Sequence, residues 1–192
     1  MSPVTHKVLP YIVVHDEDKN FESNIQGDIM DWMDSYSLKH KGNNRSNVNG
    51  YQSPDNFYKE PSFDKFLSYM EDRIDKMIES YREHEYVSWD NQYKLSNMWF
   101  NINYTGCYNA QHTHPGCPLA GVMWIDVPHN SGEFTFHHHD SHSLAELQTT
   151  TWSYEPTAGL MMLFPGSLAH HVDENRSRES RYSIAFNLYD KY

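Results

Sequence analysis

Two histidines, His112 and His114, stand one residue apart in the segment YTGCYNAQHTHPGC, residues 104–117. Residues i and i+2 of a β-strand point to the same face, so the two imidazoles are expected to be neighbours. That spacing can supply two ligands to a divalent metal, but it also suits an exposed polar pair at a strand end. A third ligand has to come from elsewhere, and His170 is the candidate, because it follows an apolar strand and a Pro-Gly turn. Its neighbour His171 must point away if both lie on a strand.

Other residues of similar chemistry are given plainer interpretations. The run His137–His139, together with His142, favours a solvated strand end over a metal-binding tract, because it has no partner at tetrahedral ligand spacing. Cys107 and Cys117 flank the candidate site and are expected to be buried free thiols. Two cysteines make no disulfide framework.

The elements that must position these residues show a period of two from residue 94 onward. Apolar and polar residues alternate over 98–104, 134–136 and 182–188, which is typical of strands with one buried face. Three more short apolar segments, LAGVMWIDV, TTTWSY and LMMLF, are strand candidates separated by turn residues. This pattern, which has no helices between the strands, predicts a mainly β fold built as an antiparallel sandwich or barrel. The simplest such architecture is a jelly roll preceded by helices.

The N-terminal half is mixed. Residues 7–17 indicate a strand interrupted by Pro10, and therefore an edge strand. Apolar residues fall at helical spacing over 21–36, whereas 41–56 is a loop by its Asn, Gly, Ser and Pro content. A second amphipathic helix is expected from Ser62, its N-cap, to Tyr81, with its apolar stripe as a packing face.

Length and charge limit the classes of function. The 192 residues fit one domain, in which 1–90 form an N-terminal strand, helices and loop, and 91–192 form a jelly-roll metal-binding core. A formal net charge of −11 disfavours nucleic acid and anionic membranes as partners. No apolar run approaches the ~18 residues of a membrane span, and no signal-like segment is seen, so a cytoplasmic location is expected.

The motifs resemble a known family. Gly106 followed by His112-Thr-His114, and Pro165 followed by His170, are similar to the paired motifs of cupin-type double-stranded β-helices. The segment HHVDENRSRESRYSIAFN resembles the distal histidine and Arg-x-Ser of the 2-oxoglutarate- and iron(II)-dependent oxygenases. Together with NVNGYQSPDNF, LAGVMWIDVP and LFPGSLAHHV, the similarity covers roughly residues 46–189 and points to a branch of hydroxylases.

The resemblance implies roles for individual residues. His112, His114 and His170 are the metal ligands for Fe(II), with His112 and His170 at the two family histidine positions. The same resemblance implies that 2-oxoglutarate is the cosubstrate and that an unknown substrate is hydroxylated by O2 with release of succinate and CO2. Four residues are then expected to bind the cosubstrate: Arg181 and Ser183 at its far carboxylate, Tyr104, and Asn187 on the Arg181 face of its strand.

His114 departs from the family pattern, which has Asp or Glu at this position. Three histidines could complete the site, as in cupin dioxygenases that do not use 2-oxoglutarate, or a carboxylate such as Glu133 or Asp140 could be the third ligand. A non-enzymatic metal-binding module is the remaining alternative. Residues 41–60 and 137–155 are candidate substrate lids, and an edge strand at 7–14 could pair two chains into a homodimer.

Overall fold

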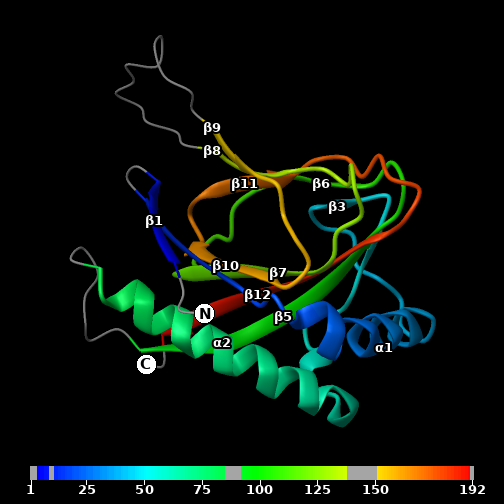
Figure 1. The fold of residues 1–192 in the computed structure, drawn as a ribbon, viewed down its shortest axis with the longest axis horizontal. Helices are drawn as coiled ribbons and strands as arrows, with labels where there is room; N and C mark the ends of the chain where they lie inside the picture. The colour runs from blue at the N-terminus through cyan, green and yellow to red at the C-terminus, as the bar shows by residue number, and fades with distance from the viewer. Residues whose placement is uncertain (1–3, 9–10, 85–91, 138–150, 191–192) are drawn as a thin grey trace.

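Two antiparallel β-sheets face each other in the computed structural model, which describes residues 4–8, 11–84, 92–137 and 151–190 (Figure 1). The strands of the larger sheet are, in spatial order, β1 (Val4–Val8), β2 (Tyr11–Glu17), β10 (Leu160–Pro165), β7 (Leu119–Asp126), β12 (Arg181–Asp190), β5 (Tyr93–Asn103) and β4 (Tyr51–Gln52). Those of the smaller sheet are β3 (Asn47–Val48), β6 (Tyr108–His112), β11 (Ala169–Val172), β8 (Phe134–His137) and β9 (Thr151–Tyr154). The predicted mainly β architecture is confirmed.

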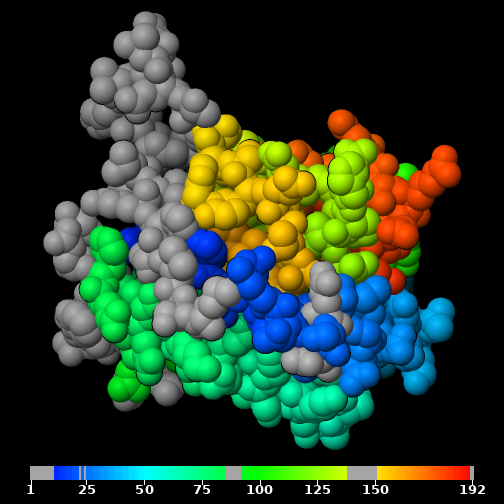
Figure 2. Space-filling model, viewed as in Figure 1, coloured from blue at the N-terminus to red at the C-terminus, as the bar shows by residue number. Residues whose placement is uncertain are grey.

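Helices cover the outer face of the larger sheet. The N-terminal helical segment begins as a π-helix, Glu22–Gln26, and continues as α1, Gly27–Ser37. Two 3-10 turns, Phe57–Lys59 and Pro61–Phe63, lead into the long helix α2, Asp64–Arg82. In Figure 1, α1 and α2 lie on the side of the larger sheet away from β6 and β11, and in Figure 2 the residues of α2 form the lower surface of the molecule. No helix within the described ranges is both long and apolar enough to cross a bilayer.

Strand alternation divides the interior into two layers. On β10, Met161 and Leu163 pack toward the helices, while Met162 and Phe164 face the smaller sheet. β12 differs, because its inward face is polar. Its helix-facing residues are apolar: Tyr182, Ile184, Phe186 and Leu188. Its residues toward the smaller sheet include buried Arg181, Ser183 and Asn187. A polar series therefore lies between the two sheets.

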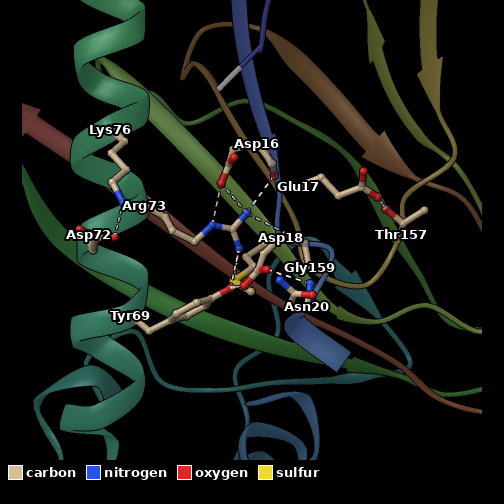
Figure 3. Close-up of polar contacts among 11 residues, drawn as sticks. Asp16, Glu17, Asp18, Asn20, Tyr69, Asp72, Arg73, Lys76, Thr157 and Gly159 are labelled. Carbon is tan, nitrogen blue, oxygen red and sulfur yellow. Dashed lines mark hydrogen bonds and ion pairs between the residues drawn. The ribbon is translucent and has the colours of Figure 1, made fainter. Parts of the chain in front are cut away.

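Arg73 joins α2 to the larger sheet through a buried ion pair (Figure 3). Its Nε donates to the Asp16 carboxylate at 2.8 Å, and its Nη2 donates to the carbonyls of Asp16 and Gly159 at 2.9 Å each. Nη1 donates to the Tyr69 hydroxyl at 3.0 Å, which in turn donates to Asp18 at 2.8 Å. One guanidinium thus ties the helix to β2 and to the turn before β10.

Several local expectations were wrong. The residues expected as one strand over 7–17 belong to two antiparallel strands, β1 and β2, because Pro10 lacks the N–H that a continuous ladder needs. β1 lies at the edge of the larger sheet, and β2 pairs with β10 through residues 14–17. Residues 41–56 contain β3 and β4. Ser62 is not the N-cap of α2; its hydroxyl accepts a hydrogen bond from Trp32 Nε1 at 3.0 Å.

We expect Arg73→Met to lower the free energy of unfolding by about 3–5 kcal/mol, because it leaves the Asp16 carboxylate buried without its partner. Urea unfolding measures the change. Lys76→Met is the matched control on the same helix. Its 2.6 Å contact with Asp72 is solvent-exposed, so the unfolding midpoint should hardly move. Equal effects of the two substitutions would contradict the anchoring role of Arg73.

Candidate metal centre

Three imidazoles converge at the smaller sheet. His112 ends β6 and is the direct cross-strand partner of His170 on β11, which brings their ring centroids to 4.4 Å. His114 follows the strand, and its ring lies 5.2 Å from that of His112 and 5.1 Å from that of His170. One ligand atom from each side chain lies within 4.8 Å of the other two. The backbone N–H of His114 donates to the Gly166 carbonyl at 2.7 Å, which holds the residue at the site without a strand.

Each imidazole is oriented by a carbonyl oxygen at its Nδ1. His112 Nδ1 contacts the Ala110 carbonyl at 2.8 Å, His170 Nδ1 contacts the Leu168 carbonyl at 2.8 Å, and His114 Nδ1 contacts Asn187 Oδ1 at 2.5 Å. A carbonyl oxygen only accepts, so Nδ1 carries the proton in all three rings and Nε2 keeps its lone pair. This is the arrangement that metal-binding histidines need.

The site keeps the histidines neutral. Burial lowers the pKa of His112, and it lowers the pKa of His170 well below the ordinary value, with His112 and His114 lowering it further. Burial is also the main cause that lowers the pKa of His114 to about 4, against the opposing effect of Asn187. His114 Nε2 is buried and has no hydrogen-bond partner among the described residues. An unprotonated, unpartnered imidazole nitrogen fits a metal ion.

Arg181 lies behind the histidines in a narrow inner cavity of about 40 Å³. Its side chain is 1% exposed, and its Nη1 donates to the Ser131 carbonyl and, at 3.2 Å, to the Asp173 carbonyl. Nη2 has no partner within the described part of the chain. Burial lowers the pKa of Arg181 to about 10, so it remains charged at neutral pH. Ser183 lines the same cavity, which therefore presents one free cationic donor and a hydroxyl to a ligand.

A second, outer cavity of about 360 Å³ adjoins His112 and His114. His112, His114 and Trp99 line both cavities, so the metal centre stands at the boundary between them. The segment 41–60, which was expected as a substrate lid, contributes residues to the wall of this outer cavity. The lining residues of the outer cavity are Arg45, Ser46, Gln52, Asp55, Asn97, Trp99, Gln111, His112, Thr113, His114, Pro115, Asn187 and Tyr189.

The other expected site residues are placed differently. Asn187 contacts His114 and lines the outer cavity, not the inner one. Tyr104 is 48% exposed and lines neither cavity. Glu133 is exposed in a separate groove on the outer side of the smaller sheet. Asp140 lies outside the described residues. Glu133 is therefore the one candidate carboxylate that the structure describes, and it does not belong to the group formed by the three histidines.

His137 and His171 contact each other outside the group of three histidines. His137 Nε2 contacts His171 Nδ1 at 2.6 Å, and His171 Nε2 contacts Asp173 at 3.0 Å. His171 therefore points away from the centre, as expected from its position beside His170. The residues from His138 to His142, and most of the second expected lid, lie outside the described residues. Both cysteines are buried free thiols, as predicted.

Some functional residues have a weak signal in the sequence. Asn101 and Trp99 on β5 face the same interior as Ser183, since Asn101 is its cross-strand partner. Asn109 on β6 also lines the inner cavity. Alternation over 98–104 identifies the inward face of β5. Polar residues on that inward face are the sign in the sequence of a lined cavity.

Comparisons with known proteins agree with this geometry. Residues 97–187 match the family model described as "Putative 2OG-Fe(II) oxygenase", a segment that runs from β5 into β12 and contains the three histidines and Arg181. No curated protein sequence matches the chain.

Solved structures with the same fold include enzymes of different chemistry. A prolyl hydroxylase from Trichoplax adhaerens, in complex with a hypoxia inducible factor oxygen degradation domain peptide fragment, has a TM-score of 0.66 at 12% identity, over 92% of this chain and 84% of that chain. HygX from Streptomyces hygroscopicus, with nickel and 2-oxoglutarate bound, has a TM-score of 0.62 at 9% identity, over 94% and 83%. SnoN, a non-heme alpha ketoglutarate dependent epimerase from nogalamycin biosynthesis, has a TM-score of 0.66 at 15% identity, over 93% and 77%. These likenesses confirm the predicted double-stranded β-helix.

Asn187→Leu should weaken divalent-metal binding about 10- to 100-fold, because His114 loses the acceptor that fixes its ring and tautomer. Equilibrium dialysis with Ni(II) and metal analysis measure the affinity. Asn187→Asp keeps an acceptor oxygen at the same place and should bind at least as tightly as the unchanged protein. Unaltered affinity in Asn187→Leu would show that the Asn187 contact does not support the site.

The metal-free protein should lose stability as the pH falls from about 6.5 to about 4. Over that range the unfolded chain takes up a proton at His114 and the folded chain does not, so low pH favours unfolding. This single group corresponds to about 3 kcal/mol at the low end. Urea midpoints at several pH values measure the slope. His114→Gln should reduce it, and an identical slope would contradict the low pKa.

Proposed function

We propose that the chain is a 2-oxoglutarate- and iron(II)-dependent dioxygenase that hydroxylates its substrate, and the family-model match over residues 97–187 supports this proposal. The proposed overall reaction is R–H + 2-oxoglutarate + O2 → R–OH + succinate + CO2. The observation that carries it is that three converging imidazoles and Arg181, with its unpaired Nη2, line one inner cavity.

The proposal assigns each residue a physical task. His112, His114 and His170 would hold iron(II) through Nε2, and the bound metal would supply the redox chemistry that activates O2. Because no carboxylate of the described residues joins these ligands, a three-histidine site would keep both charges of a divalent ion, which favours binding of a dianionic cosubstrate. Arg181 and Ser183 would both donate hydrogen bonds to the far carboxylate of 2-oxoglutarate, and the Arg181 bond would join two charged groups.

Water exclusion is the second task of the chain. Phe164 lies 4.8 Å from the His170 ring, and Phe134 lies 5.4 Å from it, measured between ring centroids. Together with Trp124 these rings form the apolar side of the inner cavity. A low-dielectric wall strengthens the attraction between Arg181 and a bound carboxylate.

One observation favours a second candidate, a three-histidine dioxygenase that does not use 2-oxoglutarate. The inner cavity is small, and Arg181 already gives Nη1 to two backbone carbonyls, so its two Nη groups cannot together grip a carboxylate in this arrangement. This candidate shares the fold and the metal ligands. It differs in requiring neither Arg181 nor the cosubstrate.

Anaerobic titration of the iron(II)-loaded protein with 2-oxoglutarate distinguishes the two functions. We expect a saturable visible charge-transfer band near ~500 nm, with half-saturation raised at least about tenfold by Arg181→Gln and less by Ser183→Ala. Arg178→Gln is the control, because that arginine is exposed. Stoichiometric iron without any band would contradict 2-oxoglutarate binding and favour the second candidate.

A further inference from the structure

The outer cavity contains two side-chain amides whose oxygens are unsatisfied. Gln52 on β4 is 4% exposed, and its Oε1 has no hydrogen-bond partner in the described part of the chain. Asn97 on β5 has a buried Oδ1 that also lacks a partner there. Both residues line the same cavity as His112 and His114. A buried acceptor without a donor costs about 1–3 kcal/mol, which a ligand with N–H groups would recover.

An aromatic plane adjoins these acceptors. Trp99 lines the cavity, and its ring centroid lies 5.6 Å from that of His114. Asn97 and Trp99 are two apart on β5 and so share its inward face. An indole face favours planar groups, and a guanidinium stacks on it well. The position beside His114 places such a group next to the metal centre.

Charge argues against an anionic ligand. The wall carries one acid and one base, Asp55 and Arg45, which lie 3.8 Å apart with side chains 44% and 66% exposed. Their charges offset each other, and the unsatisfied atoms are acceptors that would repel a carboxylate or phosphate. The net charge of −11 adds long-range repulsion of anions.

We propose that the substrate carries a planar N–H donor group, a guanidinium, ureido or carboxamide, at the end of an aliphatic chain. Its N–H groups donate to Gln52 and Asn97, its plane lies against Trp99, and an aliphatic carbon beside it faces the histidines. About 360 Å³ accommodates one group of amino-acid size, either free or as a side chain of a peptide. This assignment rests on the proposed function only in stating that the aliphatic carbon is hydroxylated. Binding of the substrate itself needs neither iron nor 2-oxoglutarate.

Binding to the metal-free protein tests the substrate class separately from the oxygenase reaction. Saturation-transfer NMR would compare L-arginine and L-citrulline, which carry planar N–H groups, with L-norleucine, which has an aliphatic chain alone. We expect arginine or citrulline to bind at least about tenfold more tightly than norleucine. N-acetyl-L-arginine amide distinguishes a free amino acid from a peptide side chain. Tighter binding of this blocked form than of L-arginine would indicate a peptide. Equal binding of norleucine, or binding by none of these probes, would overturn the proposal.

Two near-isosteric variants locate the bound group. Gln52→Met and Asn97→Leu lie on different strands, and each should weaken binding of the preferred probe about tenfold by removing an acceptor. Gln92→Met and Asn44→Leu repeat the same substitutions at exposed positions outside the cavity and should leave the affinity unchanged. Thermal unfolding verifies that each variant is folded. Undiminished affinity in both folded cavity variants would overturn the assignment. A normal probe result without the ~500 nm band would reject the oxygenase reaction alone.

Discussion

The chemistry of this protein depends on a hydrogen bond from each imidazole Nδ1 to a carbonyl oxygen. Two of the acceptors are backbone carbonyls two residues before His112 and His170, and the third is the side chain of Asn187. The backbone thus fixes two rings locally, whereas His114 depends on a strand of the opposite sheet. That dependence couples the metal site to the packing of the two sheets. A change in their separation would move one ligand relative to the other two.

Strand β12 carries most of this coupling. Its apolar face packs against the helices, while its polar face supplies Arg181 and Ser183 to the inner cavity and Asn187 to His114. The helices therefore help to form the site, because they bury the apolar face of β12 and so fix which of its residues point toward the smaller sheet. The Arg73 ion pair holds α2 to the same sheet at β2 and at the turn before β10. The stability of the fold and the geometry of the site therefore both depend on the packing of the helices against the larger sheet.

The two cavities have different polar character. The inner one offers a cationic donor and a hydroxyl, which suit an acid. The outer one offers unpartnered amide oxygens and an indole, which suit a planar group with N–H donors. A metal between them would meet a ligand from each side. Under the proposed function, a neutral three-histidine ligand set would leave the metal charge for the acid to offset.

The sequence by itself determined most strands of the C-terminal half, the inward face of β12 and the histidine pair, because these depend on alternation and short spacing. The local motifs were also enough to indicate the family. Only the tertiary structure decided that Asn187 contacts His114 and that Arg181 gives Nη1 to backbone carbonyls, since these partners lie 73, 50 and 8 residues away along the chain. It also placed Gln52 at the outer cavity, in a segment that composition alone described as loop. Side-chain partners across sheets depend on register and packing, and neither is encoded by local periodicity.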